Sequence, residues 1–148
     1  MKHPLLLFAL LSILISSCFA QLEPAWPSIY SYIEKKYPEV QQMSVEGAAQ
    51  LHSDSVMFID VRDSEEYIVS HIPGAVRYTN KKAIADALIQ GKKVVLYCSV
   101  GVRSSELVHS LGYGKKSGVY NLKGSLFTWA QKFTIIKSSK VLGRIFCP

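Results

Sequence analysis

The sequence predicts an α/β fold, in which one domain holds a central parallel sheet of about five strands with helices on both faces. Three observations predict it. The 148 residues suffice for a single domain. The short runs 56–59 and 94–97 are continuously apolar, as in strands that are buried on both faces. Such runs alternate with helical stretches along the chain, which is the order of strand–helix–strand units.

Residues 1–20 have the composition of a secretory signal. A short basic start precedes the apolar run 4–15, which is too short for an ordinary transmembrane helix and suits the h-region of a signal. Residues 15–18 (ISSC) resemble a bacterial lipobox, in which Cys18 is lipidated, but ordinary cleavage before Gln21 also fits. We favour the lipobox, and expect an exported protein: a periplasmic or cell-envelope lipoprotein if bacterial, otherwise secreted.

The rest of the chain divides by composition into three parts. Two prolines and a short helix over 28–36, which ends before Pro38, make residues 21–42 a lead-in segment. Residues 43–133 carry the strand–helix alternation and form the expected domain. Residues 134–148 are a basic C-terminal tail.

Capping and turn residues bound the expected elements of the domain. Ser44 can cap its first helix, and Asp63 with Glu66 matches a capping box at the start of the second. Gly91 and Gly112 end two later helices. The expected strands are 56–59, 75–78, 94–97 and 119–121, and a turn is expected at 71–74. The expected helices are 45–52, a short one after Asp63, 81–89, 104–111 and 126–133.

Positive charge dominates the C-terminal third of the chain. The formal net charge is +6, and no acidic residue follows Glu106, whereas seven basic residues do. We expect a solvated basic face that attracts small anions and no nucleic-acid binding, because no recognised nucleic-acid module accompanies the charge. Membrane contact is expected only through a lipid anchor. The basic residues are Lys115, Lys116, Lys123, Lys132, Lys137, Lys140 and Arg144.

The cysteines do not form a disulfide framework. Of the three, Cys18 is removed or lipidated in either processing scheme, which leaves Cys98 and Cys147. Cys147 can resolve a modified Cys98 by forming a disulfide, although a stray tail thiol is the interpretation that we favour. Cys98 follows a buried strand, and in open parallel sheets ligands bind beyond the carboxyl ends of the strands.

The loop after Cys98 has the features that a reactive thiolate needs. A tight loop that leads into a helix can turn several backbone N–H groups toward the sulfur, and the helix dipole adds positive potential. Gly101 lets the loop curl, and Arg103 supplies a fixed cation. A lone cysteine after a strand is usually a small core residue. The loop composition favours a functional role here.

Three blocks of sequence resemble the rhodanese-like family. They occur in the family's order and together cover roughly residues 43–131. The first two are specific signatures, and the third is weaker. The blocks are DVRDSEEY (60–67) continuing to HIPGA (71–75), VVLYCSVGVRS (94–104), and GY (112–113) with VYNL (119–122) and GSLFTW (124–129).

The resemblance implies a sulfurtransferase that moves sulfane sulfur from thiosulfate, a polysulfide or a persulfide to cyanide or a thiol, which can belong to a protein. Cys98 would carry the sulfur as a persulfide, and no metal or organic cofactor would be needed. Asp60, Arg62 and Ser104 would support the loop. The expected cradle is formed by Ser99, Val100, Gly101, Val102 and Arg103.

Loop length and composition refine the expected chemistry. Four residues separate Cys98 from Arg103, whereas related cysteine phosphatases have five and enclose a phosphate. Rhodaneses that prefer thiosulfate often carry basic residues inside the loop, and this chain has none before Arg103. An organic persulfide or polysulfide therefore fits as donor as well as thiosulfate does. Ser70 and Ser125 stand where glycine is common in the family.

The remaining polar and aromatic candidates have structural interpretations. We expect Arg62 to pair with an acid, Asp60 to hold backbone amides and His71 to fix a turn. Trp129 and Phe127 are expected in the core. The alternative to an enzyme is a non-catalytic rhodanese fold that acts as a binding or sulfur-carrier module in the cell envelope.

Overall fold

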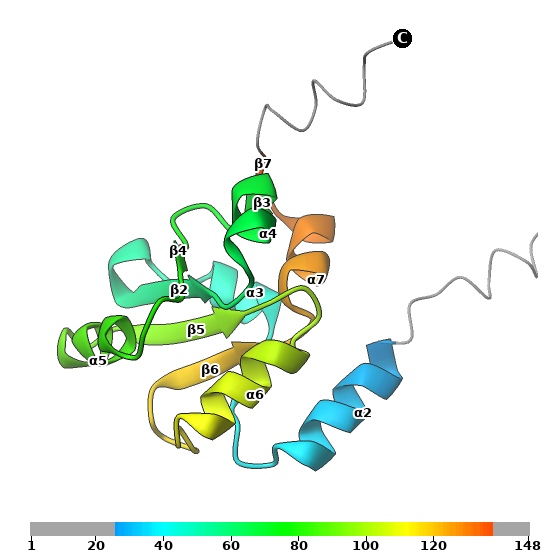
Figure 1. Ribbon diagram of the computed structural model, residues 1–148, viewed down its shortest axis with the longest axis vertical. Coiled ribbons are helices and arrows are strands. Elements are labelled where there is room, and N and C mark those ends of the chain that lie inside the picture. The colour runs from blue at the N-terminus through cyan, green and yellow to red at the C-terminus, as the bar shows by residue number, and fades with distance from the viewer. Residues whose placement is uncertain (1–25, 138–148) are drawn as a thin grey trace, which may run out of the picture.

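The computed structural model describes residues 26–137 (Figure 1). The expected signal, its Cys18, most of the basic tail and Cys147 lie outside the described residues. Within 26–137, no helix has the length and apolar character needed to cross a membrane.

The expected α/β fold and its parallel sheet are confirmed. Five strands pair in parallel in the order β1-β6-β5-β2-β4. The two central strands, β5 and β2, correspond to the apolar runs of the sequence, because both of their faces are covered. The strands are β1 (Gln42–Met43), β2 (Val56–Asp60), β4 (Val76–Arg77), β5 (Lys93–Tyr97) and β6 (Val119–Leu122).

Helices cover both faces of this sheet, as predicted. Side chains alternate along β5, so Val94 and Leu96 pack under α2, α5 and α6, while Val95 and Tyr97 pack under α3 and α7. The helices are α2 (Trp26–Lys36), α3 (Val45–Ala49), α4 (Ser64–Val69), α5 (Lys82–Ile89), α6 (Val102–Ser110) and α7 (Ser125–Lys132), with a 3₁₀ turn η1 (Ser53–Ser55).

A short antiparallel ribbon was not expected. Strand β3 (Ser70–His71) pairs with β7 (Ile136–Lys137), where the sequence suggested the start of a turn and an irregular tail. These two short segments pair only because α4 and α7 bring them together. No local sequence pattern predicts that arrangement. The ribbon lies beside α4 (Figure 1).

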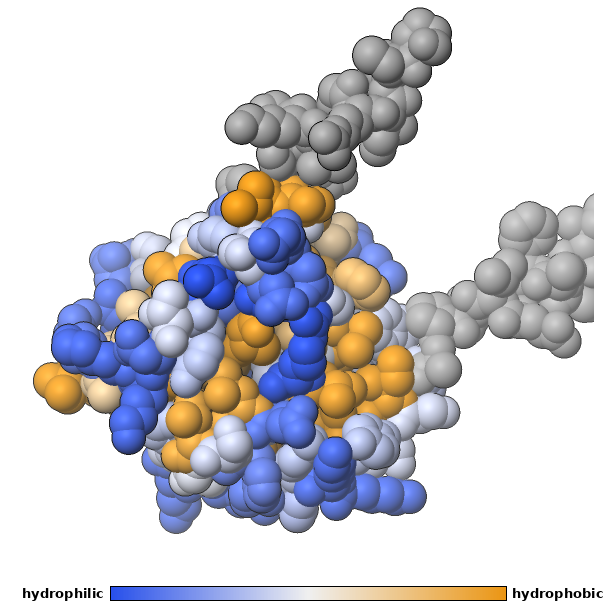
Figure 2. All heavy atoms as spheres, viewed as in Figure 1, coloured by the Kyte–Doolittle hydropathy of each residue, from blue (hydrophilic) through white to orange (hydrophobic). Residues whose placement is uncertain are grey.

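One aromatic residue expected in the core is on the surface. Trp129 is 7% exposed and packs edge-on against Phe58, whereas Phe127, two residues earlier on α7, is 52% exposed. Positions two apart on a helix point in different directions, so both cannot face the sheet. Figure 2 shows hydrophobic residues on both sides of a narrow hydrophilic strip, on the face of the molecule where α4 and α6 lie.

Candidate functional site

Cys98 lies at the carboxyl end of the central strand β5, where the sequence placed it. It is a free thiol and is 1% exposed. The chain turns sharply at Gly101, which adopts φ 102° as the N-cap of α6 and whose N–H donates to Cys98 Sγ at an N···S distance of 3.1 Å. A Cβ at Gly101 would lie 3.2 Å from Asn121 Nδ2. The positive φ therefore favours glycine at this position, and a Cβ would also crowd Asn121.

Backbone donors stabilise the thiolate against the effect of burial. Burial raises the pKa of the Cys98 thiol, but hydrogen bonds from Ser104, Gly101 and Val100 outweigh it, and the pKa lies below its ordinary value. The Ser104 hydroxyl has only one proton, and its Oγ lies 2.5 Å from Asn121 Oδ1. The hydroxyl donates that proton to Asn121, so Ser104 donates to the Cys98 sulfur through its backbone amide.

The start of α7 fixes the other side of the loop. The Ser125 hydroxyl accepts from the Cys98 amide at 3.3 Å and donates to the Leu122 carbonyl at 3.0 Å. The amides of Leu126 and Phe127 donate to the Cys98 and Ser99 carbonyls, both at 3.1 Å. Ser125 has φ 50°, in the left-handed region. Glycine adopts this conformation easily, which explains why glycine is common at this position in the family. Sequence reasoning gave Ser125 no part in the site.

Arg103 is paired with Glu66 of α4. Its Nη1 and Nη2 donate to the two carboxylate oxygens of Glu66 at 2.8 and 2.9 Å, and Nη2 also reaches Ser99 Oγ at 3.2 Å. The guanidinium beside Glu66 lowers the pKa of that carboxyl to about 2. The Arg103 pKa is raised, first by Glu66 and to a smaller extent by Cys98, so both negative groups favour the charged guanidinium. Sequence reasoning missed this role of Glu66.

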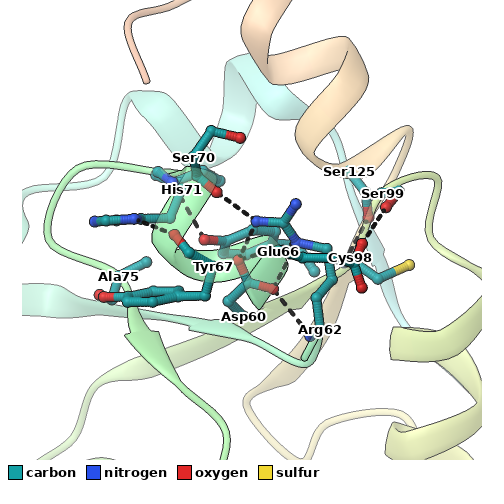
Figure 3. A network of polar contacts seen from close by, with 12 residues as sticks. Asp60, Arg62, Glu66, Tyr67, Ser70, His71, Ala75, Cys98, Ser99 and Ser125 are labelled. Atoms are coloured by element: carbon teal, nitrogen blue, oxygen red, sulfur yellow. Dashed lines mark hydrogen bonds and ion pairs between the residues drawn. The ribbon is translucent and has the colours of Figure 1, made fainter. Parts of the chain in front are cut away.

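Asp60 and Arg62 form a second pair, and this one is buried. The side chains are 0% and 5% exposed, and Arg62 Nη2 lies 2.6 Å from Asp60 Oδ2. Arg62 also donates to the Ser70 carbonyl at 2.6 Å (Figure 3). Burial opposes the charge of Arg62, but the hydrogen bond to Asp60 leaves its pKa raised. The pair ties the end of β2 to β3, in agreement with the structural interpretation.

The histidines are held by other contacts. His71 stacks on Tyr67 with ring centroids 4.1 Å apart, and its Nδ1 lies 2.8 Å from the Tyr67 carbonyl oxygen (Figure 3). His109 on α6 pairs with Glu39, and its side chain is 55% exposed. Over the described range 26–137, no cluster of three or more His, Cys, Asp and Glu side chains is placed to hold a metal ion.

Comparison with known proteins agrees with this geometry. The rhodanese-like domain matches the chain over residues 44–132, which is more than half of its length. The chain belongs to the rhodanese-like family. Membership places it in a sulfur-transfer family, and the loop from Cys98 to Arg103 lies within the matched range.

Named relatives share only part of their length with this rhodanese-like chain. It is 32% identical over 80 residues to the uncharacterized protein slr1261 of Synechocystis, covering 53% of this chain and 45% of that protein. It is 35% identical over 79 residues to the probable adenylyltransferase/sulfurtransferase MoeZ of Mycobacterium tuberculosis, covering 50% of this chain and 20% of that protein. The chain thus spans less than half the length of these two relatives.

Solved structures show the fold. A thiosulfate sulfurtransferase from Pseudomonas aeruginosa superposes with a TM-score of 0.56 at 15% identity, covering 73% of this chain and 22% of that one. The BH2092 protein from Bacillus halodurans gives 0.51 at 18% identity, covering 76% and 85%. At these identities the likeness concerns the rhodanese fold alone.

Proposed function

We propose that this protein is a sulfurtransferase that carries sulfane sulfur as a persulfide on Cys98. The observation that supports it best is the cradle of backbone amides around a thiol whose pKa is lowered. The same donors suit the terminal sulfur of a persulfide, which also bears negative charge.

The proposed reaction has two displacements. The Cys98 thiolate attacks the outer sulfur of the donor, a new S–S bond forms, and the donor's S–S bond breaks with its electron pair leaving on the departing group. A thiol or cyanide acceptor then attacks the outer sulfur of the Cys98 persulfide. The Cys98 thiolate is regenerated, so no net oxidation or cofactor is required.

The first test is persulfide formation on the purified protein. After incubation with thiosulfate or a polysulfide, the intact mass should rise by one sulfur atom, and cyanide should remove that atom as thiocyanate. The increase should be lost in Cys98→Ser and kept in Cys147→Ser, which removes a different thiol.

The outcome separates the alternatives. Sulfur that loads on Cys98 and leaves with cyanide once, without turnover, would indicate a sulfur carrier in place of an enzyme. A protein that acquires no sulfur from any donor would be a binding module, and the proposed function would be wrong.

A further inference from the structure

Within residues 26–137, three cations on or beside the Cys98 loop are each paired with a carboxylate. Arg103, at the start of α6, is held by Glu66 through two hydrogen bonds. Two cations that follow the neighbouring strands β2 and β6 are also paired with carboxylates. These other pairs are Arg62–Asp60 at 2.6 Å and Lys123–Glu34 at 2.9 Å.

The Glu66–Arg103 pair persists throughout the physiological pH range. The pKa of Glu66 is about 2, so its carboxylate stays ionised, and the guanidinium is always charged. Once Cys98 ionises, the three groups together carry a net negative charge. Among residues 26–137, the backbone amides of the loop and the helix dipole add positive potential, and both are weaker than a full unpaired cation.

Uncharged side chains complete the surroundings of the loop. Val100 and Val102 are partly buried within it, and the backbone of Phe127 is hydrogen-bonded to Ser99 while its side chain is 52% exposed. Figure 2 shows hydrophobic residues on both sides of a narrow hydrophilic strip, on the face of the molecule where α4 and α6 lie. The loop thus offers an incoming donor apolar contact and N–H groups.

We infer that Glu66 determines donor specificity: by pairing with Arg103, it disfavours dianionic thiosulfate and favours persulfides whose organic group is uncharged. The inference rests on the proposed function. Thiosulfate brings two negative charges to a negative site and must release sulfite, also a dianion. A persulfide R–S–S⁻ brings one charge and releases R–S⁻ when its S–S bond breaks, while the Cys98 thiolate gains the outer sulfur. Repulsion is therefore smaller throughout the second reaction.

Two donors and two matched variants test the inference. The donors are thiosulfate and 2-hydroxyethyl persulfide, and the readout is the second-order rate of persulfide formation on Cys98 by intact mass. Glu66→Gln keeps the size of the side chain and removes its charge. Glu65→Gln makes the same charge change one residue away, on an exposed side chain of the same helix.

The wild-type protein should react faster with the persulfide than with thiosulfate. Glu66→Gln should raise the thiosulfate rate about fivefold, the effect of roughly 1 kcal/mol for a partly exposed pair, and change the persulfide rate less. The new thiosulfate reaction should slow at high ionic strength, because it depends on the freed charge of Arg103. Glu65→Gln should behave as wild type. A second persulfide donor is a protein with one persulfidated cysteine, and its rate shows whether a small or a protein persulfide reacts faster. A rate above that of thiosulfate with either persulfide supports the inference.

The possible failures are distinguishable. If Cys98 gains no sulfur from any donor, the proposed function fails and the inference with it. If Cys98 is loaded but the wild-type protein prefers thiosulfate, or if Glu66→Gln matches Glu65→Gln, only the inference on specificity is overturned.

Discussion

Two arginine–carboxylate pairs lie near the carboxyl ends of neighbouring strands and differ in burial. Asp60 and Arg62 are 0% and 5% exposed and lie two positions apart in one segment. Glu66 and Arg103 are 35% and 45% exposed and join α4 to α6 across 37 residues of sequence. The first pair also holds a backbone carbonyl of β3, and the second also contacts Ser99 of the cysteine loop.

Burial decides what such an ion pair can do. A buried pair gains little net stability from its formation, but it is costly to break, because one charge then stays buried without a partner. An exposed pair is screened by water and contributes little to stability. The charges of its two side chains, however, still act on a ligand that approaches the surface. We therefore assign the Asp60 pair to stability and the Glu66 pair to specificity.

The largest expected effect is that of Asp60→Asn. The substitution leaves the Arg62 guanidinium buried without its carboxylate, and we expect the free energy of unfolding to fall by about 3–5 kcal/mol. Chemical denaturation monitored by circular dichroism measures it. Persulfide formation on the fraction that stays folded should be little changed.

A double variant sharpens this prediction. Asp60→Leu with Arg62→Met removes both charges, and it should recover part of the lost stability because no unpaired charge remains. If Asp60→Asn costs less than 1 kcal/mol, the buried pair is not the structural element that its burial suggests.

The fold could be predicted from the sequence where burial leaves a local pattern. The apolar runs that became β2 and β5 are covered on both faces, and both were identified. Strand β1 has two residues, Gln42 and Met43, too few to show any periodicity. It exists because Gln42 pairs with Asn121 of β6, a partner remote in sequence.

The site could be predicted only as far as it is local. The loop places Cys98, Gly101 and Arg103 within six residues, and their roles follow from their spacing. Glu66 occupies the last position of a capping-box pattern, so the sequence suggested a local role for it at the start of the helix and no distant partner. In the structure the Asp63 side chain makes no capping hydrogen bond, and the Glu66 carboxylate extends across to Arg103. Only tertiary packing selects that partner.

The second prediction concerns the exposed pair. Arg103→Lys keeps the charge but cannot form two parallel bonds to Glu66 while also reaching Ser99. We expect the rate of persulfide formation on Cys98 to fall about fivefold, the equivalent of one charged hydrogen bond of about 1 kcal/mol, while stability changes by less than about 1 kcal/mol. The exposed Arg77→Lys on β4 serves as control. A loss of stability as large as that of Asp60→Asn would contradict the distinction between the pairs.

The smallest expected effect is the contribution of Glu66 to stability, and its pH dependence gives its sign. The pKa of Glu66 is lowered from 4.5 to about 2 on folding, so the folded state favours the ionised form. The stabilisation is therefore complete above pH 4.5 and is lost as the pH falls toward 2. Because both side chains are more than a third exposed, we expect the free energies of unfolding of wild type and Glu66→Gln to differ by only about 0.5 kcal/mol at pH 7.

Denaturation at pH 7, 4 and 2.5 should show this difference shrinking with acidification, whereas Glu65→Gln should show no such trend. A difference that grew toward low pH would mean that protonated Glu66 is the stabilising form, and that Arg103 is not its partner in solution.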